Sequence, residues 1–222
     1  FIKNAKKINK ISYEEMLEMA SLGAKVMQPT SIQEARINRV EIDVRSTFSK
    51  KQGTKITKKK NILGKDTIRG ISFTKNDAKL TLVGVKDKPG VAASIFKPLF
   101  ENSINVDMVV QNISAGGKET DLTFTIKLED LNKTRKLVEN NKEINFKNLI
   151  VNKNVSKVSI VGVGMITTPG ITFRMFKALA KKKINIEVIS TSEIKISVLI
   201  NKKNLKKSVE ILHQEFKLSN SL

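Results

Sequence analysis

The sequence contains no cysteine, no tryptophan and a single histidine among its 222 residues. The absence of cysteine excludes disulfides and thiol chemistry, and it is typical of proteins in a reducing compartment. One histidine does not make a metal-binding cluster, so we expect no metal site. The helical pattern around His213 predicts a solvent-facing side chain without a catalytic role.

Long apolar runs are also missing. No stretch approaches the roughly 20 apolar residues that span a bilayer, and the first residues do not form a signal peptide. We therefore expect a cytoplasmic protein with no membrane partner. The chain opens on Phe1 in the middle of a pattern, which we interpret as a piece of a longer protein.

Acidic residues are too few to balance the basic ones, and the formal net charge is +20. Clustered lysine and arginine would indicate binding to nucleic acid. Here the lysines are scattered, with tight runs only at Lys58 to Lys60 and Lys181 to Lys183. The first run lies in a predicted linker and the second at the end of a predicted helix, where cations suit the helix dipole. We interpret the charge as compositional and do not predict a nucleic-acid partner.

One stretch of the chain occurs twice. Ala78 to Ala92 reads AKLTLVGVKDKPGVA, and Lys157 to Thr172 reads KVSIVGVGMITTPGIT. Each copy is an alternating apolar run, then a polar turn, then a Pro-Gly pair that opens a helical pattern. Ile104 to Asp107 matches Ile184 to Glu187, 80 residues later. Matched strands with unmatched loops indicate a duplicated module.

Each copy predicts the order βαββαβ, an α+β fold with helices on one face of an antiparallel sheet. The second copy lacks a last strand after Phe216, whereas Thr67 to Thr74 is a strand without a partner, ended by Lys75 to Asp77. We predict that this strand pairs with the second copy, so that the first copy is inserted within the second. Pro98 lies inside a predicted helix and should free the carbonyl of Ser94, which predicts a kink or an early end.

The first 60 residues do not belong to the repeat. Ser12 and Glu15 form a capping box, and the helix that follows ends at Gly23. A second helix opens at Pro29, and Val40 to Val44 is a predicted strand. This is too little for an independent core, so we interpret it as the tail of a larger α/β domain. The predicted boundaries are 1–60 for this tail, 61–77 for a linker and donated strand, 78–154 for the first module and 155–222 for the second.

The turn before each helix has a structural and a functional interpretation. Proline suits the first turn of a helix because its missing N–H is not needed there. The N–H groups at such a helix start, with no side chain in the way at Gly90, also suit a carboxylate. Asp87 would supply a counter-charge for an ammonium group, and Asn105 and Gln111 on the adjacent strand could add hydrogen bonds. Together these groups predict a site for an amino-acid zwitterion.

These residues resemble a known family. VKDKPGVAASIF followed by INVDMVVQNIS resembles the first ACT module of aspartate kinases, and VSIVGVGMITTPGIT followed by INIEVISTSEIKISVLI resembles the second. ISYEEMLEMASLGAKVMQPTSIQEAR and IDVRSTFSKKQGT are similar to the last part of that family's kinase domain. The resemblance implies two ferredoxin-like ACT modules packed side by side, preceded by the tail of an α/β amino-acid-kinase domain.

The function that the resemblance implies is regulatory. The family transfers the γ-phosphoryl group of ATP to the side-chain carboxylate of aspartate, toward lysine, threonine and methionine, and its ACT modules sense threonine or lysine. The family's glycine-rich start and catalytic lysine are not in this chain, so we expect no catalytic residues, no activity of the chain alone and no bound cofactor. ATP and Mg²⁺ would belong to the complete enzyme. The implied partners are a threonine or lysine effector, or both, and either a second copy bound through the ACT modules or the catalytic kinase domain.

The effector contacts of the family can be placed residue by residue. The second turn, Met165 to Thr168, has no acid matching Asp87, so we expect the second module to complete sites that the first module begins. The implied contacts are Asp87, Lys88, Pro89, Gly90, Val91, Ala92, Asn105, Val106, Asp107 and Gln111 in the first module, and Ile171, Thr172, Asn185, Ile186, Ser192 and Glu193 in the second.

Two alternatives stay open. The order βαββαβ is also that of RNA-binding RRM modules, which stack bases on aromatic side chains of the middle strands. Here the matching strand of the first module offers only Phe124, on the face assigned to the core, and the second module offers none. A purely structural pair of modules is the other alternative, and it leaves Asp87 beside the Pro-Gly turn unexplained.

Overall fold

The computed structural model describes residues 2–58, 67–113 and 119–219. The contacts divide the chain into two units, one formed by residues 1–74 and 157–222 and the other by residues 75–156. Residues 61–66 of the predicted linker lie outside the described residues. No helix of the described part is long and apolar enough to cross a membrane.

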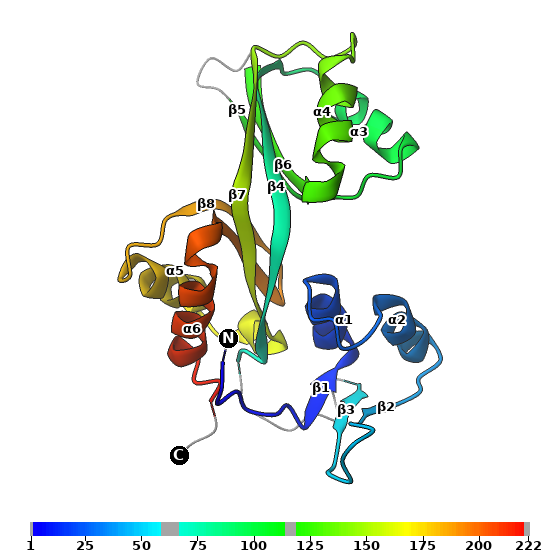
Figure 1. The fold of residues 1–222 in the computed structure, drawn as a ribbon, viewed down its shortest axis with the longest axis vertical. Coiled ribbons are helices and arrows are strands. Elements are labelled where there is room, and N and C mark those ends of the chain that lie inside the picture. The colour runs from blue at the N-terminus through cyan, green and yellow to red at the C-terminus, as the bar shows by residue number, and fades with distance from the viewer. Residues whose placement is uncertain (1, 59–66, 114–118, 220–222) are drawn as a thin grey trace. The chain divides into compact units, whose positions relative to one another are not determined.

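The inserted unit, residues 75–156, has the order βαββαβ. Its sheet follows the strand order β5-β6-β4-β7, and α3 and α4 cover one face of it (Figure 1). The core between sheet and helices contains Leu80, Leu82, Ile95, Leu99 and Phe124, each fully buried. The three strand residues lie on one face of the sheet because side chains alternate along a strand, and Ile95 and Leu99 lie four residues apart on one face of α3. The elements are β4 (Gly70–Lys86, from residue 75 on), α3 (Val91–Glu101), β5 (Val106–Ile113), β6 (Glu119–Lys127), the 3₁₀ turn η2 (Leu128–Asp130), α4 (Leu131–Glu139) and β7 (Asn148–Val161, up to residue 156).

The second module lies in the other unit and repeats the arrangement. Its strand order is β4-β7-β9-β8, with α5 and α6 on one face (Figure 1). The start of β4 joins this unit: the N–H of Arg69 donates to the Val161 carbonyl at 2.8 Å, and Ile68 is part of the module's core. The remaining elements are η3 (Val163–Thr167), α5 (Ile171–Ala180), β8 (Ile186–Thr191), β9 (Lys195–Asn201), η4 (Lys202–Asn204) and α6 (Leu205–Glu215).

The N-terminal segment of the same unit forms a small sheet with two helices. The strand order is β1-β3-β2, with β1 parallel and β2 antiparallel to β3. The capping box of Ser12 and Glu15 at the start of α1 is confirmed. Strands β1 and β3 were not expected from the sequence. The elements are β1 (Lys10–Ser12), α1 (Tyr13–Ser21), α2 (Pro29–Ile37), β2 (Ile42–Val44) and β3 (Thr54–Thr57).

Strand β4 differs from the prediction of a break at Lys75 to Asp77. It is one strand of 17 residues that runs through both units. Lys75 and Asn76 are exposed, so the polar side chains reach water while the backbone stays extended. The pairing with β6 begins at Asp77, opposite Lys127.

Helix α3 does not end early at Pro98, as the sequence had suggested. It continues to Glu101, with Pro98 inside it. The Ser94 carbonyl, which Pro98 leaves without its helical donor, accepts a hydrogen bond from Asn141 Nδ2 at 3.1 Å. The prediction for His213 was also wrong, because its side chain is only 7% exposed at the end of α6.

Candidate functional site

The turn between β4 and α3 is open to solvent. Asp87, Lys88, Pro89 and Gly90 are all exposed. Gly90 is the N-cap of α3 in a left-handed conformation with φ 90°, and nothing lies within 4 Å of the place where a Cβ would stand. The glycine is therefore required by the backbone conformation rather than by close packing.

The helix begins directly after the Pro-Gly pair. Its first residue is Val91, so Pro89 lies outside the helix rather than in its first turn. The N–H of Val91 donates to the Lys88 carbonyl at 3.2 Å, and Val91 itself belongs to the core. No side chain caps the helix start. The N–H groups of Ala92 and the next residue are the ones that point out of the first turn.

The register of the sheet places the other predicted contacts of the first module at two different distances from the turn. Gln111 pairs with Leu122, which pairs with Leu82, near the end of β4 that leads into the turn. Val106 pairs with Ile126, which pairs with Ala78, eight residues before Lys86. At roughly 3.3 Å per residue this row lies about 26 Å along the strand from the turn. One copy of the chain therefore brings Gln111 toward Asp87, and it does not bring Asn105, Val106 and Asp107 there.

The exposure of these residues leaves most of them available to a ligand. Asn105, Asp107 and Gln111 are exposed, while Ala92 and Val106 are half-buried. Within the described part of the chain, neither cavity of note includes any predicted contact. One, of about 380 Å³, lies between α3 and α4, and the other, of about 870 Å³, lies in the unit that holds the second module.

The second turn repeats this geometry in part. Gly170 has φ 85° and caps α5, again with open space at its Cβ position. The N–H of Gly162 donates to the Ile194 carbonyl at 2.9 Å, so the exposed Ser192 and Glu193 lie beside the second turn. Ile186 pairs with Ile200, whereas Thr191, five residues later at the other end of β8, pairs with Ile196. Asn185 and Ile186 are therefore at the end of the sheet away from the turn, as Asn105 and Val106 are in the first module.

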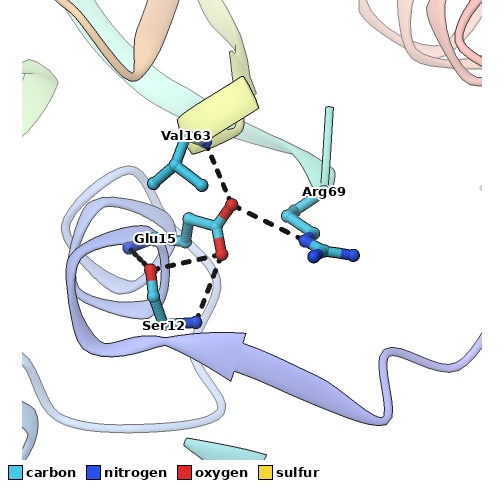
Figure 2. Close-up of polar contacts among 4 residues, drawn as sticks. All are labelled: Ser12, Glu15, Arg69 and Val163. Carbon is cyan, nitrogen blue, oxygen red and sulfur yellow. Dashed lines mark hydrogen bonds and ion pairs between the residues drawn. The ribbon is translucent and has the colours of Figure 1, made fainter. Parts of the chain in front are cut away.

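The two turns differ in what touches them. In the structure the second turn begins with η3, at Val163. The N–H of Val163 donates to Glu15 Oε1 at 3.0 Å, and Glu15 belongs to helix α1 (Figure 2). Arg69 Nε lies 3.7 Å from the same oxygen. Of the predicted residues here, Ile171 is buried in the core and Thr172 is exposed.

Comparison with known proteins agrees with the duplicated fold. A family model described as the ACT domain matches residues 80–141 and 158–216. The regulatory subunit of aspartate kinase from Thermus thermophilus, in its ligand-free form, is 35% identical, and its structure aligns with a TM-score of 0.63 over 68% of this chain and 99% of that one. The chain belongs to the aspartate kinase family.

Other aspartate kinases match over nearly the whole chain. The curated aspartate kinase of Pseudomonas putida is 44% identical over 219 residues, which is 98% of this chain and 53% of that protein. The structure of the aspartate kinase from Clostridium acetobutylicum is 26% identical and aligns with a TM-score of 0.87 over 97% of this chain and 50% of that one. The chain thus spans about half the length of the curated relatives it matches, and it corresponds to their regulatory part with its ACT domains.

Sequence reasoning missed Glu15 as a contact of the second turn. Its only sequence signal was the capping box with Ser12, which predicts a helix start and nothing more. The bond to Val163 joins residues 148 positions apart, so no local pattern could have indicated it.

Proposed function

We propose that this chain senses an amino acid and thereby regulates an aspartate kinase, which phosphorylates the side-chain carboxylate of L-aspartate with ATP. The observation that carries the proposal is the exposed turn from Asp87 to Gly90 at the start of α3, in a chain that carries two ACT domains. Catalysis, with ATP and Mg²⁺, belongs to the other half of the enzyme, which acts in the cytoplasm. The chain alone is inactive as a kinase and holds no cofactor.

The effector is threonine or lysine, or both. A free amino acid is small, so its affinity depends on its ammonium and carboxylate groups, and each needs a preformed partner. The carboxylate of Asp87 is exposed and suits the ammonium. The N–H groups at the start of α3 suit the carboxylate, because they carry the positive end of the helix dipole. Gln111 lies toward the same end of the sheet and can bind the effector side chain.

A second copy completes this site. Asn105, Val106 and Asp107 lie at the far end of the sheet from Asp87 within one chain. They can reach an effector at the first turn only if another copy brings them there. We therefore favour a homodimer through the ACT modules, in addition to contact with the catalytic kinase domain. In the second module, Ile171, Thr172, Ser192 and Glu193 share one end of the sheet and would contribute from there, while Asn185 and Ile186 lie at the other end.

Binding of free amino acids to the chain tests the proposal. Calorimetric titrations with threonine, with lysine and with both together should show binding by at least one of them. Glycine, which has both charges and no side chain, is the matched control and should bind more weakly. A folded chain that binds neither threonine nor lysine would contradict the proposal.

RNA binding is the alternative from another class, and the structure weakens it. Phe124, the aromatic residue that an RRM would use on this strand, is fully buried and packs edge-on against Phe96 with ring centroids 5.4 Å apart. It belongs to the core between the sheet and the helices. Stacking on a base requires an exposed ring.

A further inference from the structure

The second turn is held by a carboxylate that comes from another part of the chain. The first turn carries its own acid, Asp87, which is exposed. The second turn has none, and the N–H of Val163 at its start donates instead to Glu15 Oε1 at 3.0 Å. The two copies of the repeat thus differ in the acid at the turn: the acid of the first turn faces solvent, while an acid from α1 binds the second turn.

Each oxygen of Glu15 has its own donors. Oε2 accepts from the N–H and from the hydroxyl of Ser12, both at 3.2 Å, and so fixes the start of α1. Oε1 accepts from Val163 and lies 3.7 Å from Arg69 Nε (Figure 2). Glu15 is fully buried, and a buried carboxylate is tolerated only with such a set of partners. The side chain therefore bridges α1 and the second turn through its two oxygens.

The surroundings of the bridge leave little room for independent movement. Gly162 lies directly before the turn, and a Cβ there would stand 2.2 Å from the carbonyl oxygen of Thr67. Arg69, two residues further along, donates its N–H to Val161. A second bond joins α1 to the start of β9, because Lys195 Nζ donates to Glu18 Oε2 at 3.1 Å, and the preceding residue, Ile194, accepts from the N–H of Gly162. The turn and α1 are packed so that a displacement of one changes the contacts of the other.

We propose that Glu15 is a positioning residue that couples the second turn to helix α1, so that the second module transmits a change of state between the ACT modules and the kinase-domain segment. The coupling proposal rests on the proposed function in one respect only, namely that binding of an amino-acid effector causes the change of state. The coupling itself is a property of the bridge, and it acts equally in both directions.

A ligand-free double-mutant cycle tests the coupling. Ile166→Gly loosens the turn without removing a buried contact, since Ile166 is 50% exposed and glycine has greater backbone freedom. Amide hydrogen exchange of α1, at Met16 to Ala20, should become several-fold faster in this variant of the 222-residue chain. In a Glu15→Leu background the same substitution should leave α1 exchange unchanged. Leucine is of similar size and has no hydrogen-bond acceptor, so the N–H of Val163 loses its bond to position 15.

Ser12→Ala is the matched control. It removes one donor to Oε2 and weakens the cap of α1, but it leaves Oε1 bound to Val163. The effect of Ile166→Gly on α1 should persist in this background. Glu15→Asp, with its carboxylate one methylene shorter, replaces Glu15→Leu if the latter does not fold, and it should also abolish the effect.

An equal effect of Ile166→Gly in the wild-type and Glu15 variant backgrounds would overturn the proposal, as would no effect on α1 in the wild type. Titration of the same proteins with threonine and with lysine is a separate measurement. If the wild type binds neither amino acid, the proposed function is contradicted, while the double-mutant cycle still tests the coupling. If an amino acid binds, its effect on α1 exchange should disappear in the Glu15 variant.

Discussion

Asn141 Nδ2 donates a hydrogen bond to the main-chain oxygen of Ser94 at 3.1 Å. That oxygen would ordinarily accept from the N–H four residues later in α3, but the residue there is Pro98, which has no N–H. The loop after α4 thus supplies the donor that the helix lacks, and α3 continues past the proline to Glu101.

Asn141→Ala should therefore destabilise the chain by about 1–3 kcal/mol, since it leaves a carbonyl unsatisfied and also removes the acceptor for the Glu143 N–H. The loss should shrink in a Pro98→Ala background, because the new N–H can bond to Ser94. Urea unfolding of the four proteins measures both effects. Asn140→Ala, at the exposed neighbouring position, should change little. Equal losses with proline and with alanine at position 98 would contradict this account of the helix.

The burial of His213 predicts a pH dependence of stability. Burial lowers the pKa of His213 below its ordinary value of 6.5. The unfolded chain therefore binds a proton at a higher pH than the folded chain does. The contribution of His213 is fully present above about pH 6.5 and is lost as the pH falls through the folded-state pKa.

His213→Gln, which does not titrate in this range, should lose less stability than the wild type between about pH 7.5 and about pH 5.5. Urea unfolding at both values gives the comparison. Glutamine keeps a polar side chain of similar size beside Ser219, whose hydroxyl lies 3.4 Å from Nδ1. An identical pH dependence in the two proteins would show that His213 titrates as an exposed residue.

The net charge of +20 predicts weak, salt-sensitive association with RNA and no sequence preference. Binding of single-stranded RNA oligonucleotides should disappear by about 200 mM salt, where an electrostatic complex has lost most of its affinity. Fluorescence anisotropy with two oligonucleotides of different sequence tests this. A sub-micromolar affinity that survives this salt, with preference for one sequence, would support the RNA-binding alternative.

The sequence predicted the parts of the fold that depend on local pattern. Alternating apolar runs, such as the one with Leu80 and Leu82, occur in both copies of the repeat and predicted two βαββαβ modules. The pair Ser12 and Glu15 predicted the start of α1. The sequence could not predict contacts between distant segments. The burial of His213 depends on how α6 packs, and the bond from Val163 to Glu15 depends on where α1 lies.

The sequence predicted which residues belong to the candidate site, but only partly how those residues lie relative to one another. The exposure of Asp87 and the left-handed Gly90 agree with a turn that is open to a ligand. The distance between this turn and Asn105 follows from the pairing of β5 with β6 and of β6 with β4, and a register cannot be read from one strand alone. The contacts of the effector itself stay a prediction.

Asp87 is the residue on which the proposed function depends most. A charge-assisted bond to the ammonium group contributes about 1.5–3 kcal/mol, or on the order of 10–150-fold in affinity. Asp87→Asn should weaken the binding of threonine or lysine by that factor, while the fold survives because the exposed turn contributes little to the core. In the full-length enzyme it should relieve inhibition and leave uninhibited turnover near normal, since an effector acts only through its preference for one state.

Calorimetric titration of the wild-type and Asp87→Asn chains with threonine and with lysine is the most direct test. Glu101→Gln, an exposed acid of the same unit at the far end of α3, is the matched control and should bind as the wild type does. We predict affinity lowered 10–150-fold in the Asp87 variant alone. Unchanged affinity in a folded Asp87→Asn chain would mean that the effector binds elsewhere and that the first turn is structural.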